Sequence, residues 1–191
     1  MKNGQLLIMI LSISVLIVFL ANCTKSPTVE QEPLVNSERK LIVSSPEELS
    51  FPIGQAVDNP ALFNGTVYLS QLVSRDDVFN TPNMALVVFE PMVINKWHVH
   101  GGGQILIATD GIGYHQIEGQ PIEVMFPGDV AKCPPGVKHW HGAIPDSWFA
   151  HIAISTNPDM SSLEIFDLIP EVEYLTLPRE KNQTIFGNRQ M

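Results

Sequence analysis

Two histidines and a glutamine in the stretch NKWHVHGGGQILIATDGIGYHQIEG have the spacing of metal ligands. His98 and His100 are two residues apart, and on a β-strand such residues point to the same face. Two imidazole nitrogens projected side by side from a rigid backbone can fill adjacent coordination positions of a metal ion. Three glycines follow, and Gln104 then opens the next segment, so its amide oxygen is a candidate third ligand. Ordinary residues of a strand and its turn are the alternative interpretation.

The remaining histidines extend this pattern, because all six lie between His98 and His151. His139 and His141 repeat the two-residue spacing in the stretch PGDVAKCPPGVKHWHG. His141 therefore shares the face of His139 and is a candidate general base, with a structural histidine as the alternative. His151, in FAHIAIS, is the second candidate catalytic residue. We expect His115, in GYHQIEG, to be a partly exposed strand histidine away from the site.

These residues resemble the two motifs of the cupin superfamily. The first motif runs Gly, five residues, His-X-His, three or four residues, Glu, six residues, Gly. The second runs Gly, five residues, Pro-X-Gly, two residues, His, three residues, Asn. The chain matches them at His98, His100, Gly111, Gly128, Pro134, Gly136 and His139. It departs from them at Met92 for the leading glycine, Gln104 for the glutamate and Ala143 for the asparagine.

The resemblance implies an all-β fold, a single-domain cupin jelly-roll antiparallel β-barrel. A divalent metal would sit in its mouth, bound by His98, His100, Gln104 and His139. The chain is similar to small bacterial cupins that include the manganese-dependent cupin hydroxynitrile lyases. This implies manganese or iron first, then zinc or nickel, and a lyase, isomerase or decarboxylase step on a small substrate. An iron-dependent cupin dioxygenase and a non-enzymatic protein that binds a metal or small ligand are the alternatives.

The glutamine has a chemical consequence for such a site. Three neutral imidazoles and a neutral amide leave a divalent ion with its full charge, whereas a glutamate would cancel part of it. The open coordination positions would then favour anions such as cyanide, carboxylate, alkoxide or enolate. This pattern favours Lewis-acid chemistry.

The segments around the motifs read as short strands. Runs of β-branched and aromatic residues, mostly at 8 to 12 residue spacing, are broken by Gly, Pro, Asn and Asp, which is typical of an all-β sandwich or barrel. The predicted strands are 65–72, 83–90, 95–100, 104–109, 112–118, 122–126, 130–133, 139–143 and 149–155. Residues 158–169 have a weak helical pattern, and VEYLTL, residues 172–177, is predicted as an edge strand.

Charge and composition exclude several classes of function. The chain has 11 basic and 20 acidic residues, a net charge of −9 at pH 7. Nucleic-acid binding needs a basic face, which this composition does not favour. The Gly-X-Ser-X-Gly motif of serine hydrolases is absent from the sequence. A small-molecule substrate is therefore expected, and Cys133, which has no disulfide partner if Cys23 is lipidated, is expected to be an apolar filler.

The N-terminal residues predict export. Residues 6–21 are almost entirely apolar, about the length of a signal-peptide core and short for a membrane span. Leu20-Ala21-Asn22-Cys23 resembles a bacterial lipobox, which implies cleavage before a lipidated Cys23. We therefore expect a signal peptide (1–22), a lipidated cysteine with a flexible linker (23–45), the barrel (46–178) and a tail (179–191). The protein would be a membrane-anchored lipoprotein facing the periplasm or cell surface. It would be a homodimer or higher homo-oligomer, and an arm within residues 51–69 could pair two copies.

Overall fold

The computed structural model describes residues 41–76 and 81–180. The predicted signal peptide, Cys23 with most of the linker, and residues 181–191 of the tail lie outside the described residues. Within the described ranges, no helix is long and apolar enough to cross a membrane.

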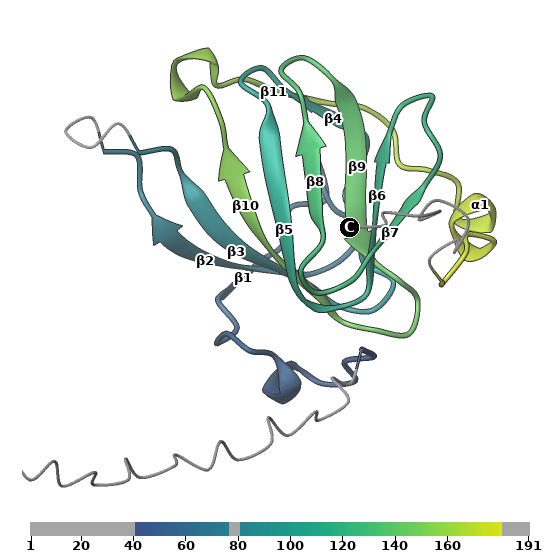
Figure 1. The fold of residues 1–191 in the computed structure, drawn as a ribbon. Helices are drawn as coiled ribbons and strands as arrows, with labels where there is room; N and C mark the ends of the chain where they lie inside the picture. Colours follow the sequence, from purple (N-terminus) through teal and green to yellow (C-terminus); the bar gives the residue numbers. More distant parts are fainter. Residues whose placement is uncertain (1–40, 77–80, 181–191) are drawn as a thin grey trace, which may run out of the picture. The chain divides into compact units, whose positions relative to one another are not determined.

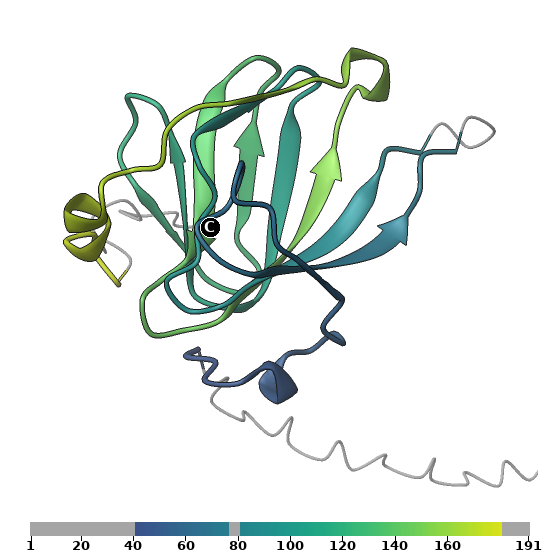
Figure 2. The same cartoon turned by 180° about the vertical axis from the view of Figure 1, so that it is seen from behind.

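Two antiparallel sheets wrap around a common interior (Figures 1 and 2). The six-stranded sheet has the order β1-β2-β3-β10-β5-β8, with β1 (Gln55–Val57), β2 (Val67–Val73), β3 (Met84–Phe89), β10 (Phe149–Ser155), β5 (Gln104–Gly111) and β8 (Val130–Cys133). The five-stranded sheet has the order β11-β4-β9-β6-β7, with β11 (Leu163–Ile165), β4 (His98–His100), β9 (Lys138–Ala143), β6 (Gly113–Ile117) and β7 (Glu123–Met125). Short 3-10 turns occur at η1 (Pro46–Glu48) and η2 (Pro158–Met160), and a single helical turn at α1 (Glu171–Leu175).

The prediction of an all-β jelly-roll barrel is confirmed, and each of the nine predicted strands has a counterpart. The alternation of burial explains why. Along β5 every second residue is buried, and β8 shows the same period of two. One face of each strand therefore lines the interior, where Phe89, Leu106, Ala131 and Phe149 form the main apolar core. His151 shares the inward face of β10 with Phe149, and its ring contacts that of His141 on β9.

Four motif positions have a positive φ, at Met92, Gly111, Gly128 and Gly136, and two of them show what this requires of the side chain. Gly111 has a φ of +67°, and a Cβ there would lie 1.7 Å from the carbonyl oxygen of Trp148, so only glycine fits. Met92 has a φ of +68° at the place of the first motif's leading glycine. A side chain in this region costs roughly 1–2 kcal/mol, so the departure at Met92 carries a backbone strain that glycine would not.

Two minor predictions near the C-terminus are wrong. Residues 158–169 form the short turn η2 followed by β11, because the backbone of Leu163–Ile165 pairs with the open edge of β4. Residues 172–177 are not an edge strand, since Glu171–Leu175 forms α1. There Tyr174 is buried and donates a hydrogen bond from its hydroxyl to the carbonyl of Ala143 over 2.9 Å. This tertiary contact has no signature in the local sequence.

Candidate metal centre

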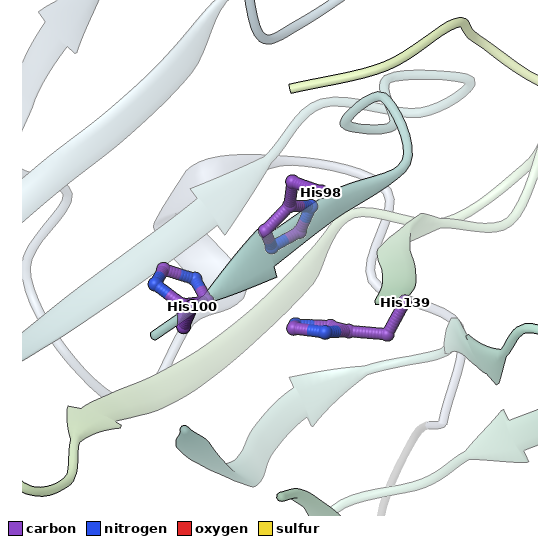
Figure 3. A group of neighbouring side chains, drawn as sticks. All are labelled: His98, His100 and His139. Atoms are coloured by element: carbon purple, nitrogen blue, oxygen red, sulfur yellow. The ribbon is translucent and has the colours of Figure 1, made fainter. Parts of the chain in front are cut away.

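Neighbouring strands bring the three candidate histidine ligands together (Figure 3). His98 and His100 project from β4 on one face, and His139 on β9 is the direct cross-strand partner of His98. One ring nitrogen from each histidine lies within 4.8 Å of the others. The ring centroids of His98 are 5.0 Å from His100 and 4.3 Å from His139. We call His98, His100 and His139 the outer cluster.

Backbone carbonyls set the tautomer of two members of this cluster. His98 Nδ1 lies 2.9 Å from the carbonyl oxygen of Lys96, and His139 Nδ1 lies 3.1 Å from that of Val137. A carbonyl oxygen can only accept, so the proton of each ring is on Nδ1. The Nε2 atoms of His98 and His139 therefore carry free lone pairs, which is the state of a metal-binding imidazole.

Gln104 provides a test of whether a cation fits. Its Oε1 lies 3.2 Å from His139 Nε2, and the Gln104 side chain is buried. With the proton of His139 on Nδ1, both of these atoms are acceptors, and two buried acceptors at this distance repel each other. A cation bound by both would turn the repulsion into attraction. The donor set of three imidazole nitrogens and one amide oxygen suits a divalent first-row transition metal.

The glycine loop between β4 and β5 is held firmly in place. Gly103 has a φ of +82°, and the carbonyl oxygen of Gly102 accepts hydrogen bonds from Thr156 Oγ1 (2.7 Å) and Asn157 Nδ2 (2.9 Å). The amide of Gly136 donates to the carbonyl of His100 over 3.1 Å. The loop that sets the spacing of the histidines and Gln104 is thus fixed from two sides.

Burial keeps the outer cluster neutral. Desolvation lowers the pKa of His98 to about 4, despite the Lys96 carbonyl, which raises it. Desolvation, followed by the nearby His98, lowers the pKa of His139 to about 3. His100 is half-buried, and desolvation lowers its pKa too. At neutral pH these imidazoles are unprotonated bases, as metal ligands must be.

The two predicted catalytic histidines lie deeper in the barrel, and we call them the inner pair. Their rings are 4.8 Å apart and nearly perpendicular. The His141 ring is 5.5 Å from that of His98, and the His151 ring stacks against Phe89 and Phe149, with centroid distances of 5.7 and 5.3 Å. Desolvation by burial lowers the pKa of His151 to about 3 and that of His141 well below its ordinary value. In the described part of the chain, His141 Nδ1 and both nitrogens of His151 have no hydrogen-bond partner.

His115 differs from the sequence-based expectation. It is 1 % exposed, not partly exposed, and its ring lies 5.9 Å from that of His139. Its Nδ1 is 2.7 Å from Glu123 Oε2 on β7, and its Nε2 is 3.2 Å from Cys133 Sγ on β8. Burial raises the pKa of the Cys133 thiol to about 12, so the thiol is the donor of this second bond. His115 thus ties the edge strands of the two sheets together.

Asn95 was missed by sequence reasoning. It is 3 % exposed, precedes β4, and makes three hydrogen bonds to His141, through its backbone and both ends of its amide. The sequence placed Asn95 only at the start of the predicted strand 95–100, three positions before His98. Its cross-strand partner only becomes visible with the register of β9.

A small cavity lies beside one member of the outer cluster. A cavity of about 140 Å³ borders His100. Its wall includes Arg75, Asn83, Ser155 and Thr156, from the ends of the strands around the barrel mouth. The Arg75 guanidinium there is 2.6 Å from the exposed carboxylate of Asp159. Of the outer cluster, His100 is the residue that borders this cavity.

Comparison with known proteins gave two informative similarities. No family model matches the chain. The chain is 38% identical over 117 residues to (R)-mandelonitrile lyase of Granulicella tundricola, a match that covers 59% of this chain and 85% of that protein. The crystal structure of a cupin-like protein from Thermotoga maritima superposes with a TM-score of 0.61 at 39% sequence identity, covering 65% of this chain and 93% of that chain.

Proposed function

Because this chain belongs to the cupin superfamily, we propose that it is a metal-dependent enzyme that carries out a lyase-type reaction on a small polar or anionic substrate. His98, His100, Gln104 and His139 would hold a divalent ion, manganese or iron in first place and zinc or nickel in second. The observation that carries the proposal is the pair of Nδ1–carbonyl hydrogen bonds, which leaves the Nε2 lone pairs of His98 and His139 free in the outer cluster.

The choice of a lyase rests on chemistry and on the relative. A divalent ion held by neutral ligands keeps its charge, and when bound it supplies Lewis-acid stabilisation of a substrate oxygen or other anion. The similarity to (R)-mandelonitrile lyase makes a hydroxynitrile the first substrate to test. The narrow cavity beside His100 supports a small substrate.

The chain's own residues would exclude water and move a proton. His141 lies beside the outer cluster, with its ring 5.5 Å from that of His98, and His151 lies next to His141 and is buried against Phe89 and Phe149. Both imidazoles are neutral at pH 7, since desolvation lowers their pKa values. A neutral buried imidazole next to the reacting atoms can take or give a proton without first losing one to solvent.

The lyase proposal is tested by following benzaldehyde release from racemic mandelonitrile by the purified, manganese-loaded protein. We expect turnover above the uncatalysed rate, and its loss in His139→Ala. Metal-loaded protein that turns over neither mandelonitrile nor aliphatic hydroxynitriles would contradict the lyase reaction. Oxygen uptake by the iron-loaded protein would instead favour the dioxygenase.

We also propose that the protein is exported, lipidated on Cys23 and homodimeric. The apolar residues 6–21 and the sequence Leu20-Ala21-Asn22-Cys23 support lipidation. Mass spectrometry of the membrane-extracted protein should find an acylated N-terminal cysteine, which Cys23→Ser would abolish. Light scattering of the detergent-free protein would give the mass of one chain if the dimer proposal is wrong.

A further inference from the structure

The amide of Asn95 determines which nitrogen of His141 carries the proton. The backbone amide of His141 donates to Asn95 Oδ1 over 2.8 Å, and Asn95 Nδ2 lies 2.9 Å from His141 Nε2. The backbone amide of Asn95 in turn donates to the carbonyl of His141 over 3.0 Å. The Asn95 side chain is therefore held on a paired strand and buried, with one end on the backbone and the other on the ring.

These contacts leave one consistent arrangement of hydrogens. A backbone N–H can only donate, so the amide atom that faces it is the oxygen. The other end is then the NH₂ group, which also can only donate. His141 Nε2 must accept from it and carries no proton. The proton of the ring is consequently on Nδ1.

We propose that Asn95 is a positioning residue that fixes His141 as the Nδ1–H tautomer, so that His141 presents a hydrogen-bond donor, and not the lone pair of a base, to the barrel interior. This reverses the arrangement in the outer cluster. There the Nδ1–H groups of His98 and His139 are used by backbone carbonyls and the lone pairs remain free. In His141 the lone pair is used and the N–H remains free.

The surroundings of His141 show what this donor would meet. Its Nδ1 is buried and has no partner among the described residues, and the ring lies 5.5 Å from His98 and 4.8 Å from His151. A fixed N–H beside the outer cluster suits a substrate atom that carries or develops negative charge, such as an alkoxide, a carboxylate or a cyanide nitrogen. This part of the inference rests on the proposed function, whereas the tautomer does not.

The role of base then passes to His151. Neither of its nitrogens has a hydrogen-bond partner in the described part of the chain, so no contact fixes its tautomer and one lone pair is always available. Its ring stacks against Phe89 and Phe149 and contacts the His141 ring nearly at right angles. The two inner histidines would thus have different roles. His141 would donate a hydrogen bond to the substrate atom that develops negative charge, and His151 would accept the substrate's proton.

The tautomer can be measured directly by ¹⁵N NMR of the histidine side chains in the zinc-loaded protein at pH 8, since zinc is diamagnetic. We expect the His141 ring to show a protonated Nδ1 and a bare, hydrogen-bonded Nε2. A protonated Nε2 would overturn the inference. A protein that binds no metal still allows this measurement, so failure of the tautomer and failure of the metal-dependent enzyme are separate results.

Two variants sharpen the test. Asn95→Asp keeps an oxygen for the backbone amide and replaces the NH₂ group by a second oxygen, so we expect the proton of His141 to move to Nε2. Asn64→Asp is the matched control, because Asn64 Oδ1 also accepts a backbone amide, from Ile94, and its Nδ2 donates to the Met92 carbonyl instead of a ring. A His141 tautomer unchanged in Asn95→Asp, or equally changed in Asn64→Asp, would contradict the role of Asn95. The wild-type spectrum decides the tautomer even if a variant does not fold.

Discussion

The outer cluster and the inner pair contain the same residue type on the same inward face, but their imidazoles are presented in opposite ways. His98 and His139 direct their Nδ1–H groups to backbone carbonyls two residues earlier in the chain. His141 directs its lone pair to Asn95, and its Nδ1–H has no partner among the described residues. Both groups are buried and neutral, so the difference comes from hydrogen-bond partners and not from charge.

This difference shows that the face of the strand on which a histidine lies does not by itself assign its role. His139 and His141 are two residues apart on β9, so both side chains point to the same face of the strand. What separates them is the neighbour on each side: Val137 for His139 and Asn95 for His141.

The largest effect is expected within the inner pair. His151→Gln removes the proposed base and should lower kcat for the hydroxynitrile reaction by about 10²–10⁴-fold, the usual contribution of general base catalysis. His141→Gln keeps an N–H donor of similar reach and should cost less than His151→Gln. Steady-state kinetics of the manganese-loaded variants give both numbers. A larger loss of kcat in His141→Gln than in His151→Gln would indicate that His141, and not His151, is the general base.

Acid should destabilise the metal-free protein through both groups of histidines. The pKa is lowered from 6.5 to about 4 for His98 and to about 3 for His139 and His151, with desolvation as the main cause. The unfolded chain therefore binds more protons than the folded chain between these values, so stability is fully present above pH 6.5 and is lost as the pH falls. Each histidine should cost about 2 kcal/mol between pH 6.5 and pH 5.

Denaturant unfolding of the metal-free protein at several pH values checks this loss. His151→Gln removes one titrating group and should reduce the loss over this interval by about 2 kcal/mol. Lys96 and Val137 contribute only carbonyls, so substituting their side chains should leave it unchanged. A free energy of unfolding that is flat from pH 6.5 to pH 5 would mean that the histidines are solvated.

Gln104→Glu adds a negative charge beside the outer cluster and leaves both residues of the inner pair unchanged. A carboxylate in place of the amide oxygen should tighten manganese binding by about tenfold and weaken the binding of azide to the bound metal. Competition against a chelator measures the first effect, and the manganese electron paramagnetic resonance signal reports the second. Unchanged affinities for both would place Gln104 outside the ligand set.

The smallest effect on stability is expected at Met92, which lies outside both the outer cluster and the inner pair and serves as a control. Met92→Gly should stabilise the protein by about 1 kcal/mol, because Met92 occupies the left-handed region with a φ of +68°. Among the described residues, Asn157 is the other non-glycine residue with a positive φ. Asn157→Gly should raise the free energy of unfolding by less, since asparagine tolerates this conformation. Chemical denaturation measures both. Neither variant should change metal binding or the dependence of stability on pH.

The sequence allowed much of this molecule to be predicted, and the failures have a common cause. Strand spacing predicted an all-β sandwich or barrel and put His98 and His100 on one face, because a period of two is a local property. The resemblance to cupins implied the barrel and the ligand set His98, His100, Gln104 and His139. His115, Asn95 and α1 were wrong or missed since each depends on a cross-strand or tertiary partner: Glu123 and Cys133, His141, and the Ala143 carbonyl. Local pattern predicts which face a side chain is on, but not which neighbour it meets there.

Metal analysis of the purified protein, prepared without a metal-affinity tag, shows whether the outer cluster binds a divalent ion. The wild type, His139→Ala and His151→Gln would be reloaded with manganese or iron at neutral pH and their metal content measured. We expect one equivalent in the wild type and in His151→Gln, and none in His139→Ala. No metal in the wild type after reloading, or one equivalent retained by His139→Ala, would contradict a metal centre in the outer cluster.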